Sequence, residues 1–140
     1  MVKWSQVFGI IIFHFCSSVL QAQSVPYKFT HVNVNQGLSH NQVNYILKDR
    51  KGFLWVGTTS GLNRFDGYTI KVFRKDPNDS TSIHSNGVSK LFETPDGKIC
   101  VVGSSQISLY DPAKENFSSN LSSLYSRYKI PPGVIRDIVH

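Results

Sequence analysis

The chain has 140 residues and is 40% hydrophobic, 12% aromatic and 17% charged, a composition typical of a folded β-rich domain and not of a disordered tail. Its 15 Lys and Arg residues outnumber its 9 Asp and Glu residues, and the formal net charge is +6. Basic and acidic residues are scattered among one another along the chain. Because the excess charge is not gathered on one element, a nucleic-acid partner is disfavoured.

Residues 1–22 have the pattern of a secretory signal peptide. A short positive start precedes an apolar run over residues 7–15, and Ala22 provides a small residue for cleavage. The run is shorter than the roughly 20 apolar residues that cross a bilayer, so a retained anchor or a buried helix is the weaker alternative. We therefore expect an exported, periplasmic protein that keeps Cys100 as its single thiol and forms no internal disulfide.

The sequence then contains an internal repeat with a spacing of 45 positions. Residues 41–66 align with residues 86–111, although Trp55 matches Val101 only after a slip of one position. A repeat of this length is typical of architectures that stack one supersecondary unit on the next.

Each copy is predicted to form four short strands. In the first copy, β-forming residues occupy positions 43–47, 53–58, 62–65 and 68–73. Polar turns with glycine separate them, and the Asp-Gly pair at positions 66–67 is a hairpin signal. Four antiparallel strands at a period of roughly 40 to 50 residues describe one blade of a β-propeller. The second copy has the same plan in weaker form.

The expected fold class is all-β: an incomplete β-propeller of about one and a half to two four-stranded antiparallel blades after an N-terminal signal helix. Propellers close with roughly four to eight blades, so we expect a truncated product or a fragment whose uncovered blade face makes it poorly soluble or partly molten. The expected segments are a signal peptide (1–22), a leading strand or linker (23–36), a first blade (37–78), a second blade with a Ser- and Asn-rich loop (79–125) and the start of a third blade (126–140).

The first copy also carries a recognisable motif. Its residues are Gly37, Leu38, Asn41, Val43, Asp49, Gly52, Trp55, Gly57, Gly61, Leu62, Phe65, Asp66 and Gly67. This pattern resembles the two-component regulator propeller repeat, and the resemblance covers about residues 29–111. In the second copy, Cys100 or Val101 replaces the tryptophan, and residues 106–109 replace the Gly-Leu-Asn-Arg segment.

The resemblance implies the periplasmic N-terminal sensor region of a bacterial hybrid two-component histidine kinase anchored in the inner membrane. It further implies an oligosaccharide ligand, more propeller blades and a kinase in the same parent chain, and a homodimeric parent. These 140 residues contain no kinase motif or nucleotide-binding glycine box, so we expect no catalytic site and no cofactor in this segment.

Two alternatives remain open. A stand-alone secreted propeller that binds carbohydrate or protein would have the same repeats. A propeller glycoside hydrolase is less favoured, because such an enzyme needs paired carboxylates at a cleft and the sequence nominates no pair.

The residues with ligand-binding potential are Asn63, Arg64 and Tyr68, which place polar or aromatic side chains next to turns. Trp55 is expected to fill the space between blades rather than to stack on a sugar. Asp49 and Asp66, with the glycines that follow them, are interpreted as turn formers. The histidines and Cys100 lack the spacing of metal ligands, so no metal site is expected.

Overall fold

The computed structural model describes residues 29, 31–104, 106–122 and 125–126. The expected signal peptide, and the start of a third blade apart from Ser126, lie outside the described residues. Within the part of the chain that the structure describes, no helix is long and apolar enough to cross a membrane.

The described chain forms two four-stranded antiparallel sheets, each with its strands in sequence order. A short 3-10 helix, η1, precedes them at Val34–Gln36. The first sheet consists of β1 (Val43–Lys48), β2 (Leu54–Thr58), β3 (Gly61–Phe65) and β4 (Ile70–Phe73). The second consists of β5 (Val88–Glu93), β6 (Ile99–Gly103), β7 (Ile107–Asp111) and β8 (Asn116–Ser118). This confirms the expected all-β class with four-stranded antiparallel units.

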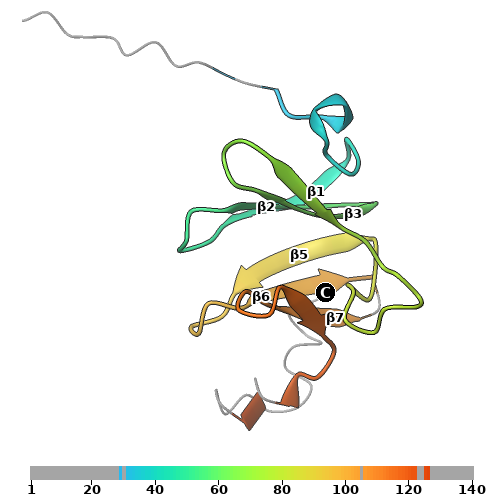
Figure 1. Cartoon of the computed structure of the whole chain (residues 1–140), viewed down its shortest axis with the longest axis vertical. Coiled ribbons are helices and arrows are strands. Elements are labelled where there is room, and N and C mark those ends of the chain that lie inside the picture. The colour runs from blue at the N-terminus through green and yellow to red at the C-terminus, as the bar shows by residue number, and fades with distance from the viewer. Residues whose placement is uncertain (1–28, 30, 105, 123–124, 127–140) are drawn as a thin grey trace, which may run out of the picture. The chain divides into compact units, whose positions relative to one another are not determined.

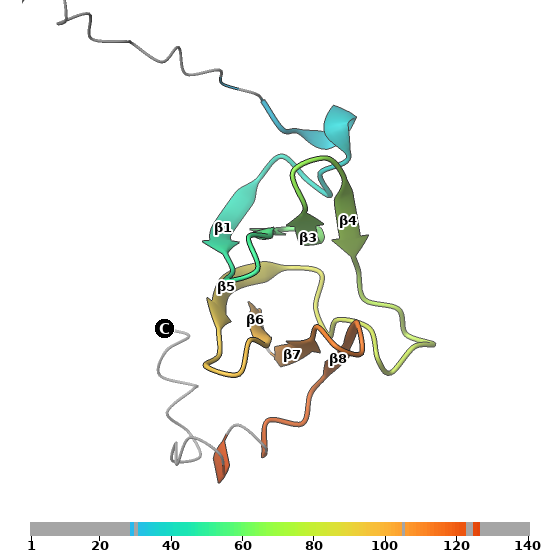
Figure 2. The same cartoon turned by 60° about the vertical axis from the view of Figure 1, so that its left-hand side comes forward.

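The two sheets lie face to face, with the first above the second in Figure 1. Figure 2 shows the same stack of two sheets after a turn about the vertical axis. A hydrophobic core fills the space between them. It consists of Trp55, Leu62, Ile83, Val88, Leu91, Ile99, Val101, Tyr110 and Phe117. Because both sheets contribute side chains to this core, neither face is complete without the other.

The pairing register shows how the two copies correspond. Trp55 pairs with Arg64 across β2 and β3, and Cys100 pairs with Leu109 across β6 and β7. Cys100 lies 45 positions after Trp55, and Leu109 lies 45 positions after Arg64. Cys100 is therefore the counterpart of Trp55 in the second copy. The alignment of Trp55 with Val101 through a one-residue slip was wrong, because such a slip would turn every side chain of the strand to the opposite face of the sheet.

The last hairpins of the two sheets differ in length. Phe65 pairs with Ile70 in the first sheet, whereas the equivalent Tyr110 pairs with Phe117 in the second. The turn between β7 and β8 is thus longer, and it includes Glu115, which has a positive φ of 52°. Glu115, on this longer turn, has no counterpart in the shorter turn of the first copy.

Strand β4 begins at Ile70, two residues later than the sequence predicted. The carboxylate of Asp66 accepts hydrogen bonds from the backbone N–H groups of Tyr68 and Thr69. These bonds hold the two residues in the turn instead of the strand.

Candidate functional site

A cleft of about 220 Å³ opens between the two sheets, beside the turn that joins β1 to β2. It is lined by Asp49, Lys51, Phe53, Trp55, Arg64, Tyr110, Pro112 and Glu115. We call it the interblade cleft. It contains one of the residues nominated for ligand binding, Arg64, together with Asp49 and Trp55 of the repeat motif.

Asp49 organises one wall of the interblade cleft. Its Oδ1 accepts hydrogen bonds from the backbone N–H groups of Lys51 and Phe53, both at 2.9 Å. Its Oδ2 accepts a hydrogen bond from Nε1 of Trp55 at 2.8 Å. The turn-forming role expected for Asp49 is therefore observed, and Gly52 adopts the positive φ of 91° that this turn requires. The bond to Trp55 was not anticipated, and its only sequence signal is the spacing of six positions between the two residues.

Trp55 forms the floor of the cleft and is only 1% exposed. Its ring lies 5.0 Å from that of Tyr110 in an edge-to-face arrangement and 5.9 Å from that of Phe73. Ring pairs at these separations stabilise a core beyond the area they bury. Trp55 thus fills the space between the sheets, as its place in the repeat predicted, and leaves almost no surface for a ligand.

Arg64 reaches from the first sheet to the second. Its Nη1 donates hydrogen bonds to Oη of Tyr110 at 2.9 Å and to Oε1 of Glu115 at 3.0 Å. The guanidinium carbon lies 4.9 Å from the centroid of the Phe53 ring, within range of a cation–π interaction. With 18% of its side chain exposed, Arg64 keeps access to solvent at the mouth of the cleft.

Glu115 receives a second cation at the same edge. Nζ of Lys71 lies 3.0 Å from Oε2 of Glu115, so the carboxylate is bridged between two strands of the first sheet. Hydrogen bonds from Lys71 and Arg64 lower the pKa of Glu115 below its usual range. Burial raises the pKa of Tyr110, and the hydroxyl oxygen of Tyr110 accepts the hydrogen bond from Arg64.

Asn63 lies on the opposite face of β3 and does not join Arg64. Its side chain is fully buried. Oδ1 accepts from the backbone N–H of Ser39 at 2.8 Å, while Nδ2 donates to Ser39 Oγ and to the carbonyl oxygen of Val56. Both ends of the amide are thus bonded to protein groups, and Asn63 anchors the loop that precedes β1.

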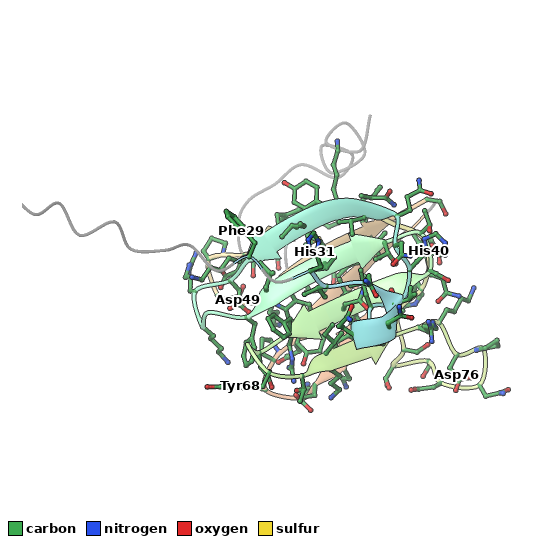
Figure 3. All side chains as sticks on the ribbon, turned by 90° about the horizontal axis from the view of Figure 1, so that it is seen from above. Phe29, His31, His40, Asp49, Tyr68 and Asp76 are labelled. Carbon is green, nitrogen blue, oxygen red and sulfur yellow. The ribbon has the colours of Figure 1, made fainter. Side chains whose placement is uncertain are left out.

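Tyr68 lies at the tip of the turn between β3 and β4, where it is 94% exposed. Figure 3 shows Tyr68 and Asp49 at the same end of the first sheet, with His40 at the other. Hydrogen bonds from Thr69 and then Tyr68 lower the pKa of Asp66 to about 2 and hold this turn in shape. The end of the sheet that carries the interblade cleft therefore also displays an exposed aromatic ring.

Cys100 lies outside this site, on the far side of the second sheet. It packs with Leu109, Phe92, Ile107 and Leu121. Burial raises the pKa of its thiol to about 12, which removes the thiolate at neutral pH. Within the described residues, no group of three or more His, Cys, Asp or Glu side chains is arranged to hold a metal ion.

Comparison with known proteins agrees with the repeat pattern. Residues 37–60 match the family described as two component regulator propeller. Histidine kinase P4 of Formosa agariphila is 47% identical over 77 residues, which make up 55% of this chain and 6% of that protein. The extracellular domain of a protein described as a hybrid two component system from B. thetaiotaomicron matches with a TM-score of 0.60 and 31% identity, over 67% of this chain and 13% of that one. The chain therefore spans a small part of the length of both relatives.

Proposed function

We propose, on the premise that the chain is a two-component regulator propeller segment, that it forms part of the exported sensor region of a hybrid two-component histidine kinase. The observation that carries this proposal is that the two sheets have the same strand-pairing register, 45 positions apart. The segment that contains the first two strands of the first sheet matches the family at residues 37–60. A histidine kinase and the extracellular domain of a hybrid system are among its relatives. Kinase activity would belong to other parts of such a protein.

The ligand that we propose is an oligosaccharide bound at the mouth of the interblade cleft. A sugar offers hydroxyl groups that both donate and accept hydrogen bonds, and apolar C–H faces that rest on aromatic rings. Arg64 and Lys51 supply donors, Glu115 supplies acceptor oxygens, and Phe53 supplies a partly buried ring at the same cleft. Tyr68 adds an exposed ring at the same end of the sheet.

Ligand binding at this place has a physical route to the rest of the protein. Arg64 and Lys71 of the first sheet meet Glu115 of the second sheet at 3.0 Å each. A ligand hydroxyl that competes for these groups would change the bonds between two blades. Because a ligand shifts an equilibrium only through its different affinity for two states, the bridge is the element through which we propose binding acts.

The experiment that tests the proposal uses the protein encoded by the complete reading frame, incorporated in membrane vesicles. Autophosphorylation is measured in the presence of a panel of defined oligosaccharides that differ in sugar, linkage and charge. We expect one class of oligosaccharide to change the phosphorylation level, and Arg64→Ala to raise the half-maximal concentration about tenfold or more, the loss expected for a charged hydrogen bond.

Arg74→Ala is the matched control, because Arg74 bonds to the carbonyl oxygens of Ser60 and Ser39 and is not part of the cleft. It should leave the half-maximal concentration unchanged. Binding without phosphorylation, by a protein with no kinase, would favour the stand-alone secreted propeller instead. Failure of every oligosaccharide to bind would overturn the ligand assignment.

A further inference from the structure

The charged side chains of the interblade cleft carry an excess of positive charge. Lys51 and Arg64 line the cleft, and Lys71 reaches the same edge through its bond to Glu115. The negative side chains are Asp49 and Glu115. Asp49 is buried and already accepts three hydrogen bonds from protein N–H groups. Glu115 is therefore the carboxylate whose bonds a ligand can exchange.

Arg64 has donor groups that the described protein leaves free. Both of its hydrogen bonds start at Nη1, one to the hydroxyl of Tyr110 and one to Glu115. Its Nε and Nη2 make no hydrogen bond within the described residues, where no buried side-chain nitrogen lacks a partner, so both atoms reach solvent. These two N–H groups point the same way and form the planar fork that binds a carboxylate through two parallel hydrogen bonds. The Phe53 ring, 4.9 Å from the guanidinium carbon, supports the plane of this fork.

Glu115 shows that a carboxylate fits beside these cations. Its oxygens lie 3.0 Å from Nη1 of Arg64 and 3.0 Å from Nζ of Lys71. Half of its side chain is exposed, so water and solutes can reach the bonds. Its φ of 52° lies in the left-handed region, which residues with a Cβ atom disfavour. Release of this carboxylate lets the turn leave a disfavoured conformation and frees two cations for another anion.

Lys51 adds a third cation, which no described carboxylate neutralises. It lines the cleft, and its ammonium group forms no ion pair within the described residues. A ligand carboxylate would be attracted by all three cations, and a partly buried site screens this attraction less than open water does. A neutral sugar hydroxyl gains much less from the same charges. The cleft therefore favours an anionic ligand over a neutral one.

We propose that the ligand of the interblade cleft is an acidic oligosaccharide, one of whose uronic-acid carboxylates binds the Nε–Nη2 edge of Arg64 and the ammonium of Lys51. Repulsion between this carboxylate and Glu115 weakens the bonds from Glu115 to the first sheet. The inference rests on the proposed binding of an oligosaccharide at this cleft and narrows its class. Towards the acid group of the ligand, Glu115 acts as a competitor.

The test uses the protein encoded by the complete reading frame in membrane vesicles, with ligands in matched pairs. Oligomers of galacturonate, glucuronate and mannuronate are each compared with the same oligomer after reduction of its carboxyl groups to alcohols. We expect at least one acidic oligomer to bind about tenfold or more tightly than its reduced partner, the gain expected for charged hydrogen bonds. Raising the salt concentration from about 0.05 M to about 0.5 M should weaken binding of that acidic oligomer and leave its reduced partner unaffected.

Four variants locate the preference for the acidic member of the pair. Glu115→Gln, which removes the competing charge, should increase the preference about threefold or more. Arg64→Lys retains the charge but has no fork, and it should lose most of the preference. Lys51→Gln should lower it as well. Lys75→Gln is the matched control, because Lys75 is exposed, bonds through its backbone N–H and does not line the cleft; it should leave the preference unchanged.

The outcomes separate this inference from the proposed function on which it rests. Equal binding of acidic and reduced oligomers, or binding of a sulfated oligosaccharide without uronic acid alone, would overturn the inference and leave an oligosaccharide sensor standing. So would a lower preference in Glu115→Gln or equal effects of Lys51→Gln and Lys75→Gln. Absence of binding by every oligosaccharide of both kinds would overturn the proposed ligand itself. The salt dependence is measured on the unsubstituted protein, so it does not depend on how well any variant folds.

Discussion

The indole Nε1 of Trp55 donates a 2.8 Å hydrogen bond to Oδ2 of Asp49, and this bond joins the turn after β1 to the core between the sheets. One carboxylate therefore both closes a local turn and orients Trp55, the largest buried side chain among the residues that the structure describes. The second copy has Thr94 and Cys100 at these positions. Its turn is held by the Thr94 hydroxyl, which accepts from the backbone N–H of Lys98 at 3.0 Å.

Replacing Asp49 should be costly for this reason. We expect Asp49→Ala to lower the free energy of unfolding by about 2 to 4 kcal/mol, because it leaves the buried indole N–H and two turn N–H groups without their acceptor. Asp49→Asn retains one acceptor oxygen and should lose less. Urea titration followed by tryptophan fluorescence measures both. Asp79→Ala, in the exposed loop before β5, is the control and should cost about 1 kcal/mol or less.

The close approach of β5 to β2 gives a second prediction. Gly57→Ala places a methyl group 2.5 Å from Val88 Cγ1 and should lower the free energy of unfolding by about 1 to 3 kcal/mol. Val88→Ala in the same chain should recover part of this loss by making room. At Gly87, where an added Cβ meets nothing nearer than 3.9 Å, alanine should have little effect. Equal destabilisation at both glycines would contradict the packing argument.

The bridge between the sheets predicts a specific pH dependence. The pKa of Glu115 is lowered in the folded protein by hydrogen bonds from Lys71 and Arg64, so folding favours its charged form. The stabilising contribution is then complete above the unfolded pKa near 4.5 and is lost as the pH falls through the lower folded value. The unsubstituted protein should therefore lose thermal stability between pH 6 and pH 3, and Glu115→Gln should lose less over the same pH range. Thermal unfolding at the two pH values measures it, and an unchanged difference would count against the bridge.

Cys100 should resist thiol reagents in the folded protein. Burial raises its pKa to about 12, and its side chain has no exposed surface. Alkylation by iodoacetamide at pH 8 should be slow in the native protein and fast in urea. Ser104→Cys, at an exposed position just beyond β6, provides the reactive control. Rapid native labelling of Cys100 would show that the far side of the second sheet opens.

A substitution at Tyr68 tests ligand binding without changing the stability of the fold. Because its side chain is 94% exposed, Tyr68→Ala should leave the thermal midpoint unchanged within about a degree. In the complete sensor, the same change should weaken the oligosaccharide response if the exposed ring contributes to binding. Tyr110→Phe is the contrasting variant, since it removes the hydroxyl that Arg64 contacts in the interblade cleft. An unaltered response in Tyr68→Ala would restrict the ligand to that cleft.

Much of the local structure could be predicted from the sequence. The strands of the first copy, the turn at Asp49 and the burial of Trp55 all follow from alternation, turn residues and the repeat spacing. The residues nominated for binding were harder to place. Asn63 and Arg64 are adjacent in the chain, yet adjacent strand residues point to opposite faces, and only one of them reaches the interblade cleft.

The sequence by itself determined the repeated four-stranded unit, because strand alternation and turn chemistry act between neighbouring residues. Only the tertiary structure decided what each face of that unit contacts. Arg64 meets Glu115 across 51 positions of sequence, and it does so because the second copy has a longer turn and a tyrosine in place of Phe65. A contact between residues so far apart in the sequence depends on how one sheet stacks on the next. The spacing of the two residues along the chain does not predict how close they lie in the folded protein.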